Sequence, residues 1–136
     1  MAKYAAFGTT LKKGAVAIAQ VRDIDGPALD SNIIKATSHD DTDGYNTFVQ
    51  GLKDAGEISL SIAYDPAGVT HKNASGGLLY EYEQGSISAY TLVFPDAGLT
   101  EWDFNALVKS FKPTAPVDGL LTADVTLKIS GAPTLA

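Results

Sequence analysis

The stretch EISLSIAY, residues 57–64, alternates apolar with small or polar residues along its whole length. Successive side chains of a β-strand point to opposite faces, so Ile58, Leu60, Ile62 and Tyr64 share one face of such a strand. Glu57, Ser59, Ser61 and Ala63 fall on the other face. This is the pattern of a strand with one buried and one solvated face, and Asp65-Pro66 ends it.

The same alternation returns near the end of the chain, over Leu120–Ser130. Leu121, Ala123, Val125, Leu127 and Ile129 are expected to point inward, and Thr122, Asp124, Thr126, Lys128 and Ser130 outward. Four further segments have strand-like patterns, namely Ala15–Asp23, Ser31–Thr37, Ser86–Phe94 and Glu101–Phe111. About six strands at this spacing predict a mainly β protein, an antiparallel β-sandwich or barrel.

One helix and two irregular segments complete the predicted organisation of a single domain, residues 1–136. Within Thr70–Gln84, the stripe of Leu78, Leu79 and Tyr82 fits a helix, although residues 80–83 alternate like a strand. We expect one flanking helix there, weakened at Gly76-Gly77 because glycine lowers helix stability. We expect an irregular N-terminal arm over residues 1–14 and a long loop over residues 38–56.

The composition of the 136 residues is that of a globular domain, with 45% hydrophobic residues, no cysteine and a net charge of −6. A net-acidic chain disfavours tight nucleic-acid binding, which depends largely on Lys and Arg at the phosphates. The longest apolar run near the start, Ala15–Ala19, is too short for a membrane span or a secretion signal. We therefore expect no membrane association and folding in the cytosol.

Few residues could carry catalysis or bind a metal. The two histidines, His39 and His71, are far apart, and no nucleophile or phosphate-binding motif accompanies them. The acidic segment 39–44 partly matches a calcium loop, but His39 and Gln50 stand where carboxylates are required. We expect no enzyme activity, no catalytic residue, no metal and no cofactor.

Several segments taken together resemble one family. They are Gly8–Leu11, Ile18–Val21 leading to Asp23–Pro27, Thr37–Asp40, Gly51–Leu60, Asp65-Pro66 and Phe94–Asp96. In their order and spacing they are similar to the tail tube protein (major tail protein) of long-tailed, non-contractile bacteriophages. The likeness extends from Gly8 to Gly131.

This resemblance implies a β-sandwich with one flanking helix, assembled as hexameric rings that stack into a tube. It implies a structural protein of the virion tail, folded in the bacterial host cytoplasm, whose tube conducts DNA during ejection without sequence-specific binding. The implied partners are further copies of the chain and the tape measure, tail terminator and tail tip proteins.

Two sets of residues are candidates for roles in such a tube. We expect opposite charges to contribute to ring stacking, with Lys3, Lys12 and Lys13 in the arm and Asp40, Asp41 and Asp43 in the long loop. We expect a small, polar, weakly acidic lumen wall made of Glu57, Ser59, Ser61, Thr122, Asp124 and Thr126. An outward, solvent-facing position of the second set is an equally good interpretation.

Two alternatives stay open from the sequence. One is the tube protein of a contractile tail or a secretion system. The other is a monomeric β-sandwich that binds a sugar or a peptide, for which Trp102, Phe104 and Phe111 would have to be exposed rather than part of the core.

Overall fold

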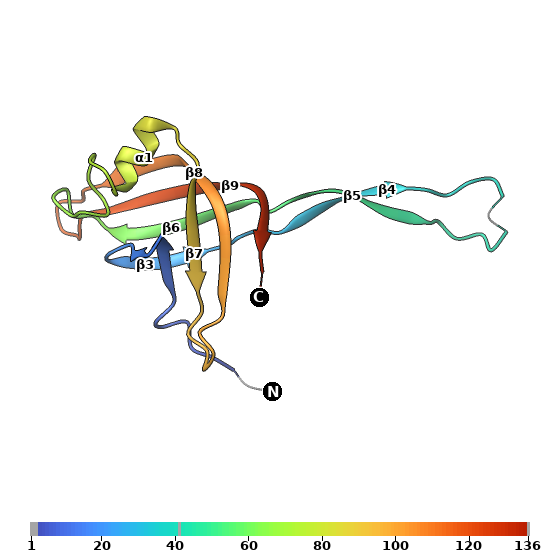
Figure 1. Cartoon of the computed structure of the whole chain (residues 1–136), viewed down its shortest axis with the longest axis horizontal. Coiled ribbons are helices and arrows are strands. Elements are labelled where there is room, and N and C mark those ends of the chain that lie inside the picture. Colours follow the sequence, from blue (N-terminus) through green and yellow to red (C-terminus); the bar gives the residue numbers. More distant parts are fainter. Residues whose placement is uncertain (1–2, 41, 136) are drawn as a thin grey trace.

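A curved antiparallel sheet forms the body of the molecule, and a two-stranded hairpin projects from it (Figure 1). The computed structural model describes residues 3–40 and 42–135. Within these ranges the sheet has seven strands, in the order β2-β1-β7-β8-β9-β6-β3. Their bounds are β1 Thr10–Lys13, β2 Val16–Ala17, β3 Val21–Asp25, β6 Glu57–Ala63, β7 Ser88–Val93, β8 Glu101–Thr114 and β9 Thr122–Thr134. The mainly β, antiparallel prediction is confirmed, with the strands in one curled sheet.

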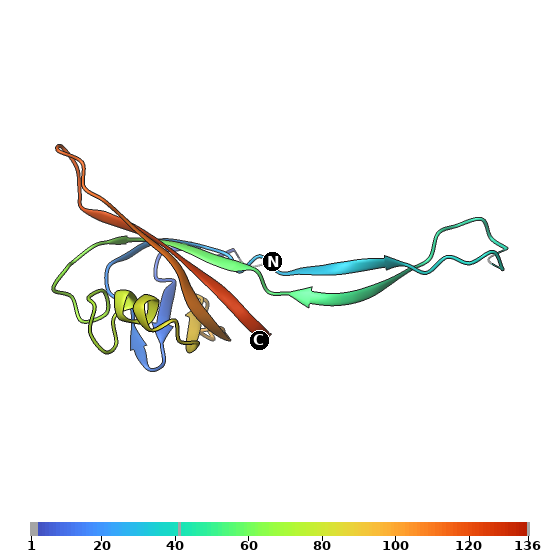
Figure 2. The same cartoon turned by 90° about the horizontal axis from the view of Figure 1, so that it is seen from above.

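The core fills the inner side of this curve. The inward residues expected from the alternation in β6 and β9 are buried, among them Ile58, Ile62 and Leu127, which are completely inaccessible to solvent. Helix α1, Leu78–Gln84, lies on the same inner side and contacts β8 (Figure 2). Leu78 is fully buried there. The predicted helix is therefore present, but it begins only after Gly77, and residues 65–77 form turns.

The two edges of the sheet are joined by three residues. Strands β2 and β3 lie at opposite edges, yet only residues 18–20 separate them in the chain. Ile18 N–H donates to Leu11 O at one edge, and Ala63 N–H donates to Gln20 O at the other. The predicted strand Ala15–Asp23 is thus two strands, interrupted where Gln20 takes a left-handed conformation with φ of 58°.

The segments expected to be irregular contain regular structure. Strand β1 occupies the end of the N-terminal segment 1–14 and pairs with β7. Strand β5, Phe48–Asp54, occupies the end of segment 38–56 and pairs with β4, Asp30–Lys35. Strand β4 falls largely within the predicted strand Ser31–Thr37, whereas β5 has no buried face and lacks the burial pattern that identifies a strand. We call residues 29–54 the hairpin arm.

Candidate functional site

The predicted wall residues from β6 and those from β9 lie side by side on one face of the sheet. In the β6–β9 ladder, Ser59 is opposite Thr126 and Ser61 is opposite Asp124. Glu57 pairs in register with Lys128, and Ala63 with Thr122. Directly opposed residues of an antiparallel ladder share a face of the sheet. The side chains of Glu57, Ser59, Ser61, Thr122, Asp124, Thr126, Lys128 and Ser130 therefore form one surface, which we call the polar face.

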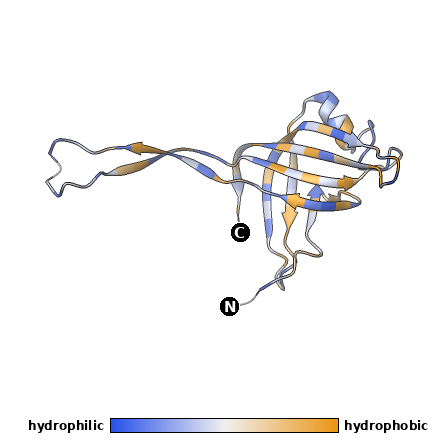
Figure 3. Cartoon of the chain, turned by 180° about the vertical axis from the view of Figure 1, so that it is seen from behind, coloured by the Kyte–Doolittle hydropathy of each residue, from blue (hydrophilic) through white to orange (hydrophobic). Residues whose placement is uncertain are grey.

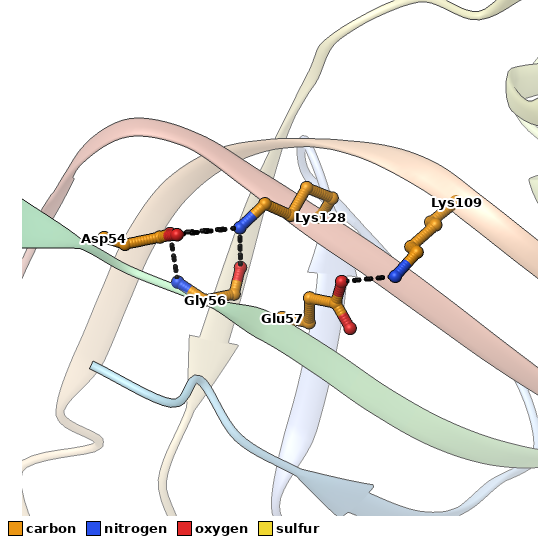
Figure 4. A network of polar contacts seen from close by, with 5 residues as sticks. All are labelled: Asp54, Gly56, Glu57, Lys109 and Lys128. Atoms are coloured by element: carbon orange, nitrogen blue, oxygen red, sulfur yellow. Dashed lines mark hydrogen bonds and ion pairs between the residues drawn. The ribbon is translucent and has the colours of Figure 1, made fainter. Parts of the chain in front are cut away.

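Ion pairs neutralise much of the charge on the polar face. Lys109 Nζ lies 2.6 Å from Glu57 Oε1, and Lys128 Nζ lies 3.0 Å from Asp54 Oδ1 (Figure 4). Lys112 is opposite Asp124 in the β8–β9 ladder. Lysines of β8 and β9 thus stand beside carboxylates on this face, and Asp23 and Asp25 of β3, which lie opposite Ser61 and Ser59, add two further carboxylates to it.

Asp54 is held ionised by its neighbours. The Gly56 N–H, 2.8 Å from Asp54 Oδ1, and the Lys128 ammonium lower the pKa of this carboxyl below its ordinary value. Lys128 Nζ also lies 3.5 Å from Gly56 O. These contacts fasten the root of the hairpin arm to β9.

Sequence reasoning missed the contact of Lys109 with Glu57 because local alternation does not give the order of strands in a sheet. Alternation from Phe104 places Lys109 on the polar side, and the sheet order β8-β9-β6 brings it within reach of Glu57. The register of β8 shifts between Val108 and Ser110, which is where a β-bulge places one extra residue, so Phe111 comes opposite the buried Val125 and packs against the core. A regular alternation from Phe104 would put Phe111 on the polar side.

The predicted stacking residues lie in different parts of the chain. Asp40 and Asp43 are exposed in the turn at the end of the hairpin arm, whereas Lys3 is exposed in the N-terminal segment of the body. One subunit does not bring these two charge groups together, because the arm points away from the body (Figure 1). Asp41 lies outside the described residues.

Lys13 has an acidic partner within its own chain. Its Nζ lies 2.7 Å from Oε1 of Glu81, which is buried in helix α1, and Ser88 Oγ donates to Glu81 Oε2 at 2.8 Å. Burial raises the pKa of Glu81, but the hydrogen bonds from Lys13 and Ser88 outweigh it and the net pKa is lowered. Burial and the Glu81 charge raise the pKa of nearby Tyr90. Lys13 therefore ties β1 to α1, whereas Lys12 carries no such buried partner among the contacts of the described residues.

His71 is a structural residue. Its ring is completely buried, Nδ1 accepts a hydrogen bond from Asp65 N–H at 3.2 Å, and Nε2 lies 2.7 Å from Ala19 O. Since Nδ1 accepts, Nε2 carries the proton and donates it to the carbonyl. Both nitrogens are committed to backbone groups, so the ring has no free position for proton transfer. His39, by contrast, is exposed in the hairpin arm.

The aromatic side chains that a sugar-binding surface would need are in or against the core. Phe104 is buried, and Trp102 and Phe111 are partly buried and pack on the core cluster. No helix in residues 3–40 and 42–135 is long and apolar enough to span a bilayer. The same ranges contain no group of three or more His, Cys, Asp or Glu side chains arranged to hold a metal ion.

The hairpin arm carries a surface that the sequence analysis did not single out. Large apolar side chains are exposed along both sides of the arm, and Figure 3 colours these hydrophobic parts of its ribbon orange. They are Leu29, Ile33, Ile34, Phe48, Val49 and Leu52. Only the three-dimensional arrangement shows that no other part of the described residues covers them.

Comparisons with known proteins identify the architecture. The chain matches a chain in the virion of a native gene transfer agent particle with a TM-score of 0.78 at 12% identity, covering 98% of this chain and 99% of that one. It matches a chain in the tail of an empty gene transfer agent particle of C6 symmetry with a TM-score of 0.67 at 15% identity, covering 88% of this chain and 84% of that one. It also matches a chain in the sheath/tube terminator structure of the extracellular contractile injection system PVC, with a TM-score of 0.74 at 13% identity, covering 100% of this chain and 98% of that one.

The sequence comparisons agree with these structural matches at the level of the family. A search of curated protein sequences found no match. The family model described as lambda phage tail tube protein, however, matches residues 3–136. With its curled antiparallel sheet, single helix and projecting hairpin, the chain belongs to the lambda phage tail tube protein family.

Proposed function

We propose that this tail tube protein forms hexameric rings that stack into a tube, and that the polar face of β6 and β9 lines the lumen through which DNA leaves the particle. The observation that carries the proposal is that the lysines of that face stand beside carboxylates, so the face has no free cluster of cations. A wall of free Lys or Arg would bind DNA by releasing counterions from its phosphates and would slow its passage. Lysines held by carboxylates, the two aspartates of β3 and small hydroxyl side chains present no excess of cations to the DNA.

The edges of the sheet support ring formation. Strands β2 and β3 each have one side without a strand partner in the described chain. Unpaired edge strands are templates for pairing with another chain. A head-to-tail contact between such edges closes into a ring when the rotation from one subunit to the next is a whole-number fraction of a full turn. The C6 symmetry printed for one structural relative supports six subunits.

In this proposal the remaining partners are the other components of a tail. They are a tape measure protein inside the tube and terminator and tip proteins at its ends, and the subunit folds in the host cytoplasm before assembly. Relatives in sheath/tube terminator and tube-terminating cap structures support a terminator contact.

A tube of a contractile system is the second candidate, and the similarity to the PVC structures favours it. Such a system has a sheath around its tube. Co-expression with the neighbouring genes of the source genome, followed by electron microscopy, separates the two candidates, because a sheathed particle appears in one case and a bare tube in the other.

The first experiment tests assembly itself. The purified chain is measured by light scattering over a concentration series, and the same sample is imaged by negative-stain electron microscopy with the tape measure and tip proteins added. Hollow tubes with sixfold end views are the expected result. A chain that stays monomeric even with these proteins contradicts the proposal.

The second experiment tests the wall. Ser59→Lys combined with Ser130→Lys places two cations on the polar face, and Ser59→Gln with Ser130→Gln is the control of similar size without charge. Both positions are exposed. We expect both variants to assemble, but only the lysine variant to eject DNA slowly, with an effect that weakens as salt rises. Equal ejection by the two variants would show that the polar face is not the lumen.

A further inference from the structure

The hydroxyl of Tyr90 is buried without a hydrogen-bond partner. The side chain is 1% exposed, and its ring stacks on Phe104 with the ring centroids 6.1 Å apart. Within residues 3–40 and 42–135 this hydroxyl is the only buried side-chain nitrogen or oxygen that makes no hydrogen bond. An unsatisfied buried hydroxyl lowers stability, and phenylalanine would bury the same ring without that cost. Its presence therefore calls for a physical explanation.

The Glu81 carboxylate lies near this hydroxyl. Ser88 and Tyr90 are two residues apart in β7, so their side chains share one face of the strand. Lys13 is opposite Tyr90 in the β1–β7 register and shares that face. Glu81 already contacts two of these three residues, with Lys13 Nζ 2.7 Å from Oε1 and Ser88 Oγ 2.8 Å from Oε2. The Glu81 charge raises the pKa of Tyr90, which shows that the two groups interact electrostatically.

Glu81 requires hydrogen-bond donors because it is buried. A buried carboxylate that loses its cationic partner is strongly destabilising. If Lys13 moved away, Oε1 would lack a donor, and the Tyr90 hydroxyl stands on the same face of β7 as Ser88. A hydroxyl that donates to a carboxylate forms a strong, charge-assisted hydrogen bond. The unpaired hydroxyl is thus explained as a donor that Glu81 uses only when Lys13 is absent.

The hairpin that carries Lys13 is attached to the body at few points. Strands β1 and β2 form this edge hairpin, residues 10–17, at one end of the sheet. Leu11 is its one buried residue, and Val16 is 58% exposed. Beyond Leu11, the tip is held by the Lys13–Glu81 ion pair, by strand pairing and by Gly14 N–H, which donates to Ala89 O at 3.0 Å. Segments with so few buried contacts open at a lower free energy than the core.

We propose that the tip of the edge hairpin, residues 12–17, opens as a strap, and that the Tyr90 hydroxyl then donates to Glu81 in place of Lys13. In the closed form Lys13 binds Glu81 and the hydroxyl is unpaired. In the open form the hydroxyl is paired and the Lys13 ammonium is in water, so neither state leaves the carboxylate bare. Opening frees the edge of β7 at Tyr90 and Thr91, where a further strand can pair. The device acts within one chain and goes beyond the proposed tube function.

Amide hydrogen exchange tests the open form directly. Exchange in residues 12–17 is measured by mass spectrometry relative to exchange in β9, in wild type and in Tyr90→Phe. We expect the substitution to slow exchange of the edge hairpin about tenfold relative to β9, because the open form loses a hydrogen bond to a charged group. Tyr64→Phe is the control, since Tyr64 also packs against the core, and it should leave the ratio unchanged. An unchanged ratio in Tyr90→Phe would overturn the proposal.

A double-mutant cycle tests the exchange of donors. Lys13→Met removes the ammonium but keeps the length of the side chain. Tyr90→Phe in the wild-type background should leave the equilibrium constant of unfolding, measured in urea, unchanged or lower. In the Lys13→Met background it should raise that constant about tenfold, because the hydroxyl is then the replacement donor to Glu81. The same effect in both backgrounds would show that the hydroxyl never bonds Glu81.

The neighbouring lysine supplies the control for the cycle. Lys12 precedes Lys13 in β1, so its side chain lies on the other face of the strand. Tyr90→Phe in a Lys12→Met background should therefore behave as it does in wild type. If Lys13→Met does not fold, the exchange experiment in the wild-type background still decides the proposal. Both experiments use the free chain, so their outcome does not depend on whether tubes form.

Discussion

His71 Nε2 lies 2.7 Å from the carbonyl oxygen of Ala19, and this contact fastens the point where the chain passes from one edge of the sheet to the other. The neighbouring Thr70 Oγ1 accepts a hydrogen bond from Ala19 N–H at 3.1 Å. Both polar groups of Ala19 are therefore satisfied by the turn segment 65–77, which packs over the crossing. The contacts thus hold the short connection, residues 18–20, that joins strands at opposite edges of the sheet.

Replacing His71 should destabilise the monomer. His71→Ala removes a fully buried ring and leaves Asp65 N–H and Ala19 O without these partners. We expect a loss of about 2–4 kcal/mol in the free energy of unfolding, measured by urea denaturation. The exposed His39 gives the control, and His39→Ala should change stability by less than about 0.5 kcal/mol. Equal effects of the two substitutions would contradict a structural role for His71.

A substitution at Gly56 should disturb the junction of the arm and the body. Gly56 has φ of +78°, and a Cβ there would meet the backbone oxygen of Ala28. Its carbonyl also accepts Ile129 N–H at 3.1 Å. Gly56→Ala should cost about 2 kcal/mol or more, lowering the urea midpoint without changing its slope. Gly98→Ala is the control, because a Cβ at Gly98 meets no atom within 4 Å, and it should be close to neutral.

The Glu81–Lys13 contact predicts a specific pH dependence. The folded pKa of Glu81 is lowered from an ordinary value of 4.5, so its ionisation stabilises the fold above that pH, and this stability is lost as pH falls through the folded pKa. Glu81→Gln should be less stable than wild type by about 1–3 kcal/mol near neutral pH. The difference should shrink below about pH 4.5, as unfolding series at several pH values would show.

The control for Glu81 lies on the same helix. Glu83 is exposed, so Glu83→Gln should change neither the stability nor its pH profile appreciably. Asp54 and Asp96 also have lowered pKa values and contribute to acid sensitivity, but equally in wild type and in both variants. A difference between wild type and Glu81→Gln that stays constant down to acid pH would mean that Glu81 is not stabilised as a carboxylate.

The sequence allowed the body of the fold to be predicted where one side of a strand is buried. Ile58 to Ile62 and Ala123 to Ile129 alternate because a core selects every second residue, and both strands were located on that signal. The polar face followed from the same alternation. The ion pair of Lys109 with Glu57 on that face did not, since it depends on the order of strands in the sheet, which local alternation does not give.

The hairpin arm was predicted only in part. Strand β4 lies within the strand-like segment Ser31–Thr37 apart from its first residue, but β5 is exposed along almost its whole length, so no burial pattern distinguished Phe48–Asp54 from a loop. Lys13 was grouped with Lys3 and Lys12 by charge alone, because its partner Glu81 is distant in sequence. The local sequence pattern does not reveal contacts between residues that are distant in sequence, such as Lys13 and Glu81.

The charges at the end of the arm give a last prediction, which concerns stacking. Exposed ion pairs contribute only about 0–1 kcal/mol each, but every subunit of an assembly would repeat the same contact. Reversing Asp40 and Asp43 to lysine should lower tube yield, and so should Lys3→Glu with Lys12→Glu. Combining both sets restores attraction with the signs exchanged, and tube length and yield in electron micrographs should then recover. Added salt should weaken wild-type assembly for the same reason, because dissolved ions screen the attraction between exposed charges over a Debye length of about 10 Å at 0.1 M and over shorter distances at higher salt. If the combined variant assembles no better than the poorer of the two parents, these groups do not meet in the tube.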